Sequence, residues 1–136
     1  MRFQSLDHMR LSITTSLDSS VDYVRILGDV DLSDSHQLGL AAKQLRHPGA
    51  RLIYVDLGGT TFMGSTLAGF LAAVGTDGRR RPLVLCRPTS AARRVIRMTG
   101  LDELASVRSD LPSAWPDDAG EVKPSGGHRR VRSCAS

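Results

Sequence analysis

Apolar and polar side chains alternate in the first patterned part of the chain, which is typical of strands with one buried face. Residues 11–15 alternate leucine, isoleucine and threonine with smaller polar side chains, and residues 21–27 alternate in a similar way. The polar stretch 18–20 separates the two runs. Two short alternating runs joined by a polar turn predict a β-hairpin.

The middle of the chain shows two other patterns. The runs 52–57 and 83–86 are almost continuously apolar, as expected for strands that are buried on both faces. Three further stripes recur at spacings of three and four residues and predict amphipathic helices. Their inner faces are Leu38, Ala41, Ala42 and Leu45, then Leu67, Phe70, Leu71 and Val74, and then Ala92, Val95, Ile96 and Thr99.

The predicted order is therefore β-β-α-β-α-β-α, with residues 105–107 as a candidate last strand. A helix between two buried strands implies a right-handed crossover and parallel pairing. The sequence thus predicts one small α/β domain over residues 11–108, with a mixed sheet and its helices packed on one side. Residues 1–10 are expected to form a loose lead-in. Residues 109–136, rich in Pro, Gly, Ser and charge, are expected to be a disordered tail.

The composition agrees with a single domain and does not favour nucleic acid as a partner. A length of 136 residues suits one domain, and only 4% aromatic residues make an aliphatic core the expectation. The single Trp115 lies outside the patterned region and is not expected to anchor the core. The net charge is +4, but the only dense basic cluster, residues 79–81, is expected to be a loop.

Cysteine placement and hydropathy favour a cytoplasmic protein. Cys86 ends a predicted buried strand and Cys134 lies in the polar tail, so no disulfide between them is expected. The chain shows no leader pattern and no apolar run of about 20 residues, so neither export nor membrane insertion is expected.

No catalytic, cofactor-binding or metal-binding set is apparent. The pair Gly58-Gly59 lacks the Lys-Ser/Thr of a phosphate loop. Asp56 ends a strand like a receiver phosphoacceptor, but the early acid pair and later lysine are missing, while Asp29 and Asp31 are expected to point to opposite sides. The histidines have no ligand spacing: His8, His36, His47 and His128. The sequence therefore predicts a protein that is not an enzyme and carries no metal or cofactor.

Ser65 is the strongest candidate for regulated chemistry. It follows a buried strand and a glycine-rich loop, and it begins a predicted helix. At such a position the hydroxyl lies near helix N–H groups without intrahelical partners, and these groups favour a phosphate. On this chemistry alone, an ordinary N-cap serine is the simpler interpretation.

Three sequence blocks resemble STAS-domain anti-sigma factor antagonists. The stretch 55–69 is similar to the family's central motif, in which a buried strand ends in Asp-Leu and Asp-Ser-Ser-Gly-Leu-Gly opens a helix. Residues 28–31 are similar to its Gly-Glu-Leu-Asp block. Arg87-Pro88, followed by residues 95–101, resembles its closing helix and turn. The blocks occur in the family's order and the resemblance extends over residues 11–108.

The resemblance implies a partner-switching role. The unphosphorylated antagonist would bind an anti-sigma factor, which is a serine kinase, and release a sigma factor, and a serine phosphatase would reset it. By position Ser65 is the implied phosphoacceptor, with Thr66 as a second candidate. The implied partner-binding surface consists of Asp31, Phe62, Met63, Gly64, Ser65, Thr66 and Leu67. A monomer or weak dimer is expected.

Two positions depart from the family motif. Gly64 stands where the family has an aspartate before the serine, and Leu67 stands where it has a glycine. The missing acid leaves open a scaffold or ligand-binding STAS module that is not phosphorylated. Leu67 is expected either to be exposed near the start of the helix or to repack inward.

Overall fold

The computed structural model describes residues 8–49, 51–76, 82–116 and 130–133. The three helices are α1 (Ser35–Gln44), α2 (Ser65–Gly75) and α3 (Ser90–Thr99), and the short 3-10 turns are η2 (Leu32–Asp34) and η3 (Leu101–Glu103). The strands are β1 (Arg10–Thr15), β2 (Val21–Asp29), β3 (Leu52–Asp56), β4 (Thr60–Phe62), β5 (Leu83–Cys86), β6 (Ser106–Arg108) and β7 (Arg130–Ser133).

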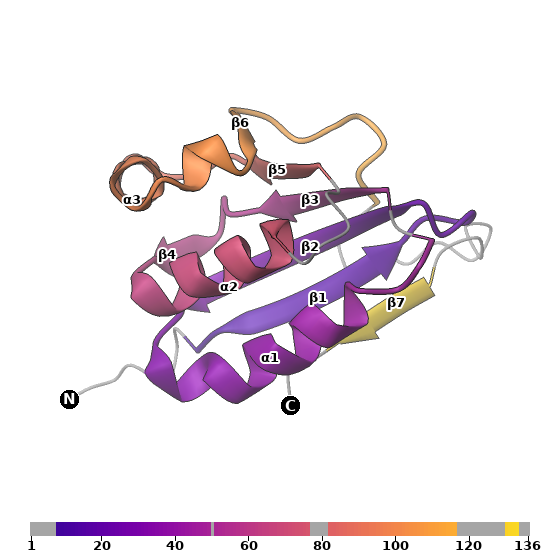
Figure 1. The fold of residues 1–136 in the computed structure, drawn as a ribbon, viewed down its shortest axis with the longest axis horizontal. Helices are drawn as coiled ribbons and strands as arrows, with labels where there is room; N and C mark the ends of the chain where they lie inside the picture. Colours follow the sequence, from indigo (N-terminus) through magenta and orange to yellow (C-terminus); the bar gives the residue numbers. More distant parts are fainter. Residues whose placement is uncertain (1–7, 50, 77–81, 117–129, 134–136) are drawn as a thin grey trace.

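The strands form one mixed sheet in the order β6-β5-β3-β2-β1-β7, with β4 beside the end of β2. β1 is antiparallel to β2 and β7, whereas β2, β3, β5 and β6 run parallel. The parallel strands β2, β3 and β5 end on the same side, where β4 and the first turn of α2 lie (Figure 1). The predicted α/β architecture is confirmed.

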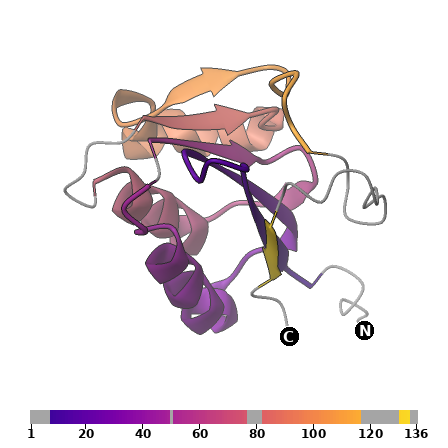
Figure 2. The same ribbon diagram turned by 90° about the vertical axis from the view of Figure 1, so that its right-hand side faces the viewer.

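The core lies between the sheet and its helices. α1 and α2 lie together along one face of the sheet (Figure 2), and the buried residues of α1, α2 and α3 belong to one cluster with those of the strands. Residues paired across β1, β2 and β3, such as Ile13, Val24 and Val55, share this face. A fully buried aliphatic side chain stabilises a fold by roughly 1.5–3 kcal/mol, so this cluster dominates stability.

The short strand β4 was not predicted. β3 stops at Asp56, but β2 continues, and its free end pairs with β4 through Gly28 opposite Thr60. Gly28 has φ of 87°, a left-handed conformation that favours glycine. Its N–H donates to the Gly59 carbonyl at 2.9 Å, and the Thr60 hydroxyl donates to the Ile26 carbonyl at 2.8 Å. These bonds hold the segment before α2 against β2.

The N-terminal lead-in is shorter than predicted, because Met9 is buried in the core and β1 begins at Arg10. Residues 1–7 lie outside the described residues, as does the basic cluster 79–81. Among the described residues, no helix has the length and hydrophobicity that crossing a bilayer requires.

The C-terminal tail also differs from the prediction. Residues 109–116 bring Trp115 against Tyr23, with ring centroids 5.2 Å apart in an edge-to-face arrangement, and β7 pairs with β1. The sequence did not predict these contacts of Trp115 and β7 with the domain. Cys134 and His128 lie outside the described residues.

The sequence predicts that removing residues 112–136 leaves the melting temperature nearly unaltered, but the contacts of Trp115 and the pairing of β7 predict a lower one. Losing the edge-to-face contact with Tyr23 and the cation–π contact between Trp115 and Arg25 is expected to lower stability by about 1–2 kcal/mol. For a chain of this length that is roughly 3–10 °C in a thermal scan followed by circular dichroism. An unchanged melting temperature would show that the Trp115 contacts contribute nothing.

Candidate functional site

Ser65 is the first residue of α2, and its side chain is exposed. Gly64 is the N-cap, with extended φ of −120°, and it makes no side-chain cap hydrogen bond. Its carbonyl accepts the first intrahelical bond, from the Ala68 N–H at 3.1 Å. The N–H groups of the first turn therefore have no intrahelical partner, and the helix dipole is positive there. Thr66 follows and is half-buried.

Phe62 supplies the apolar surface beside Ser65. Its side chain is 54% exposed, at the end of β4. A Cβ atom built on Gly64 would lie 2.9 Å from the Cε2 atom of the Phe62 ring, so the ring lies directly against the N-cap backbone. An exposed aromatic ring thus lies against the N-cap of α2, and the exposed Ser65 is the next residue along the chain.

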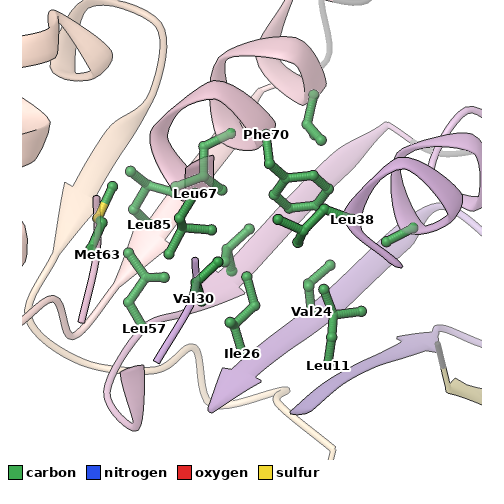
Figure 3. Close-up of a cluster of buried hydrophobic side chains, with 14 of the residues drawn as sticks. Leu11, Val24, Ile26, Val30, Leu38, Leu57, Met63, Leu67, Phe70 and Leu85 are labelled. Atoms are coloured by element: carbon green, nitrogen blue, oxygen red, sulfur yellow. The ribbon is translucent and has the colours of Figure 1, made fainter. Parts of the chain in front are cut away.

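Met63 and Leu67 do not belong to this surface. Met63 is 6% exposed and Leu67 is fully buried. Figure 3 shows both side chains within the core, in the same cluster as Leu57 and Leu85. The prediction that these two side chains contact a partner is therefore wrong. Leu67 repacks inward because it belongs to the helical stripe that faces the sheet.

Two acidic residues, Asp29 at the end of β2 and Asp31 just after it, have different roles. Asp31 is exposed and caps η2, accepting hydrogen bonds from the Ser33 hydroxyl at 2.6 Å and from the Ser33 N–H at 3.0 Å. These bonds hold the pKa of the Asp31 carboxyl below its ordinary value. Asp29 accepts a hydrogen bond from the Thr61 hydroxyl. Of these two acids, Asp29 is thus the one that contacts the segment before α2, a contact that the sequence did not predict.

Asp56, the last residue of β3, holds the start of the segment before α2, and we call it the Asp56 anchor. It is 1% exposed and accepts hydrogen bonds from Arg25 Nε at 2.8 Å, from Arg87 Nη2 at 2.8 Å and Nε at 3.0 Å, and from the Gly58 N–H at 2.9 Å. Arg87 has φ of 57°, and its guanidinium lies so close to Gly58 that a Cβ there would be 2.7 Å from Nε. A side chain at position 58 would therefore force the Arg87 guanidinium to shift from this position beside Asp56.

The electrostatic balance at Asp56 favours the carboxylate. Burial by itself raises the pKa of the Asp56 carboxyl, but the hydrogen bonds from Arg87 and Gly58 and the charges of Arg25 and Arg87 outweigh it and lower the pKa overall. With both oxygens engaged and the side chain buried, Asp56 is a structural anchor and not an accessible phosphoacceptor.

The remaining candidates for chemistry are structural. Burial raises the pKa of the Cys86 thiol to about 11, so the thiolate needed for reactivity is scarce at neutral pH. His47 Nε2 lies 2.7 Å from the buried carboxylate of Asp22, which also accepts from the Thr15 hydroxyl at 2.8 Å. Within the described part of the chain, no three His, Cys, Asp or Glu side chains cluster as metal ligands do.

Gly64 offers a test of the N-cap. The variant Gly64→Asp is expected to be about 1 kcal/mol more stable than Gly64→Ala, since an aspartate oxygen accepts an N–H of the first turn. Both variants push the exposed Phe62 ring aside equally, so their difference isolates the cap. Urea unfolding of the two variants measures it, and equal midpoints would show that α2 gains nothing from a cap.

Comparison with known proteins agrees with this fold. The family model described as Mlab, STAS domain matches residues 7–108. An anti-sigma factor antagonist from Mycobacterium paratuberculosis is 25% identical, with a TM-score of 0.62, over 72% of this chain and 87% of that one. No protein of curated function matches the sequence.

Two further solved structures share the fold at lower identity. The anti-sigma factor antagonist SpoIIAA in its unphosphorylated form is 16% identical, with a TM-score of 0.56, over 65% of this chain and 79% of that one. An anti-sigma-factor antagonist (STAS) domain protein from Planctomyces limnophilus is 17% identical, with a TM-score of 0.58, over 75% and 89%. With a family model matched over most of its length and this sheet and helix order, the chain belongs to the STAS-domain family.

Proposed function

We propose that this protein is an anti-sigma factor antagonist that works by partner switching in the cytoplasm. In its unphosphorylated form it binds an anti-sigma factor serine kinase and so releases a sigma factor. The kinase transfers a phosphoryl group to Ser65, and a serine phosphatase removes it again. The docking surface consists of Asp31, Phe62, Gly64, Ser65 and Thr66.

The observation that carries this proposal is the exposed Ser65 hydroxyl on a tightly held platform. The segment before it is bound to β2 through Thr60 and to the Asp56 anchor through Gly58. A substrate serine needs no base of its own, because the kinase supplies the metal, the nucleotide and the catalytic carboxylate. It needs an accessible hydroxyl in a fixed position, and the junction of β4 and α2 provides one. The solved anti-sigma factor antagonists with this fold support the assignment.

The same geometry explains how a phosphate would switch partners. A phosphoserine carries about −1.5 to −2 charges at neutral pH. At Ser65 the free N–H groups of α2 stabilise that charge in the unbound protein. In a complex the phosphate would be desolvated beside the Phe62 ring, and it would add negative charge near Asp29, which bonds the Thr61 hydroxyl. The modification therefore disfavours docking without disturbing the core.

Incubation with the anti-sigma serine kinase and Mg-ATP tests the proposal. We expect the intact mass to rise by one phosphate, and we expect Ser65→Ala to remove the whole increase. Thr66→Ala is the matched variant, because Thr66 is the adjacent hydroxyl, and it should keep the increase.

The opposite results assign another role. A phosphate that persists in Ser65→Ala but disappears in Thr66→Ala would move the acceptor to Thr66. A chain that binds the kinase but gains no phosphate would be an unmodified STAS scaffold, the outcome favoured by glycine at position 64. A chain that neither binds the kinase nor is modified would contradict the proposal.

A further inference from the structure

The segment that follows β6 crosses the face of the sheet that the helices leave uncovered. Tyr23 and Tyr54 lie on neighbouring strands and stack on this face, with ring centroids 5.7 Å apart and planes 8° apart. Trp115 meets Tyr23 edge to face at 5.2 Å. Residues 109–116 therefore form a strap, and they follow directly after the part of the chain matched by the family model.

Trp115 also contacts the residue that serves the Asp56 anchor. The guanidinium carbon of Arg25 lies 5.2 Å from the centre of the Trp115 ring, within the range of a cation–π interaction. The Nε atom of the same guanidinium donates to Asp56 Oδ2 at 2.8 Å. Arg25 is 18% exposed, so its conformation is set by these neighbours more than by solvent.

A continuous set of contacts thus runs from the strap to Gly58, at the start of the segment that leads to the docking surface. Trp115 holds Arg25, Arg25 pairs with Asp56, and Asp56 accepts the Gly58 N–H at 2.9 Å. Gly58 opens the segment that leads through β4 to Ser65. Each step is a direct contact, and the sheet separates the strap from the helices.

We propose that Trp115 is a positioning residue for the segment from Gly58 to Gly64, acting through Arg25 and Asp56. The strap is then a second attachment of that segment, in addition to its pairing with β2. The importance of this attachment for docking rests on the proposed function, but its physical effect does not and can be measured without a partner.

Amide hydrogen exchange of Gly58, measured relative to that of Ile53, tests the proposal on the full chain. Ile53 lies near the start of β3, at the end of the strand away from Asp56, and its N–H donates to the Pro82 carbonyl at 3.0 Å. Its exchange therefore reports changes in overall stability. In Trp115→Ala we expect Gly58 to exchange roughly three- to tenfold faster relative to Ile53, in line with the loss of one cation–π contact. We also expect the pKa of the Asp56 carboxyl, followed by NMR, to move upward.

Two variants separate positioning from general destabilisation. Trp115→Phe retains an aromatic face over Arg25 and should restore most of the protection of Gly58. Leu104→Ala removes an apolar side chain beside Gly75, on the opposite side of the sheet from Arg25, and should leave both the ratio and the Asp56 pKa unchanged.

The proposal is overturned if Trp115→Ala leaves the Gly58-to-Ile53 ratio and the Asp56 pKa unaltered, or if Leu104→Ala shifts them equally. Neither result bears on whether Ser65 docks or is phosphorylated. Conversely, a failed kinase assay leaves this exchange measurement intact.

Discussion

Replacing Asp56 by asparagine is expected to lower the free energy of unfolding at about pH 7 by about 2–3 kcal/mol. Removing one partner of a buried ion pair typically costs 3–5 kcal/mol. The lower figure applies because Arg25 and Arg87 are 18% and 43% exposed, and water screens them in part. Urea unfolding followed by circular dichroism measures the difference.

The pH dependence identifies the carboxylate as the cause. The pKa of Asp56 is lower in the folded protein than in the unfolded chain, so its contribution is fully present above the ordinary pKa, near 3.9. It is lost as the pH falls through the lowered, folded-state value. The stability difference between the original protein and Asp56→Asn should therefore be constant from neutral pH to roughly pH 5 and shrink below pH 4. Other shifted acids, such as Asp18 with a pKa of about 2, are common to both proteins and cancel.

Asp110 provides the matched control for Asp56. It pairs with Arg108 at 2.9 Å, but it is 73% exposed, so Asp110→Asn should change stability little. A stability loss in Asp56→Asn that stayed constant down to the lowest pH would mean that shape, and not charge, makes Asp56 important.

Replacing Ser65 by aspartate should weaken binding to the anti-sigma kinase by roughly 30-fold or more, which is about 2 kcal/mol. The charge would enter a desolvated interface beside Phe62 and near Asp29 at the end of β2. In the free protein the same charge sits at the positive end of α2, where it is favourable by about 0.3–1 kcal/mol. Binding should therefore fall while the melting temperature holds or rises, as measured by titration calorimetry and a thermal scan.

Two comparisons isolate charge and position. Ser65→Asn has nearly the same shape without the charge, and it should retain most of the affinity. Ser90→Asp places the same charge on the exposed first residue of α3, at the start of another helix, and should bind normally. If Ser65→Asp bound as tightly as the original chain, Ser65 would lie outside the interface.

Periodicity predicted the regular elements well. Long apolar stripes and runs indicate which faces are buried. The ends of α3 also follow local chemistry, because the Thr89 hydroxyl accepts the Ala92 N–H at 3.1 Å and Gly100 ends the helix with φ of 79°. The strand β4 was not predicted, because a strand of three residues is too short to show an alternating hydrophobic pattern. It exists only because β2 extends beyond the end of β3.

The site was predicted in part. The position of Ser65 followed from the strand, loop and helix order, but the surface around it depends on which side chains turn inward. Leu67 already belonged to the buried stripe, and Met63 precedes the N-cap with the buried Ala68 at the fourth helical position, a spacing typical of a hydrophobic staple. Those two signals were sufficient to place both residues in the core.

The ion pairs of Asp56 with Arg25 and Arg87 could not be predicted from the sequence. Its partners come from β2 and from the residue after β5, about thirty positions away on either side. Only the strand register brings them together. Asp56 pairs with Arg25 of β2 on one side and with Cys86 of β5, the residue before Arg87, on the other. Trp115 was missed for a related reason, because one aromatic residue in a polar segment has no periodic partner to indicate what it covers.

Release of a sigma factor is the most direct test of the central claim. A sigma factor bound to its anti-sigma kinase is titrated with the unmodified chain, and free sigma factor is measured by size-exclusion chromatography. The account predicts that the chain displaces the sigma factor, and that chain phosphorylated at Ser65 does not. A sigma factor that stays fully bound at saturating unmodified chain, or is displaced equally by both forms, would contradict it.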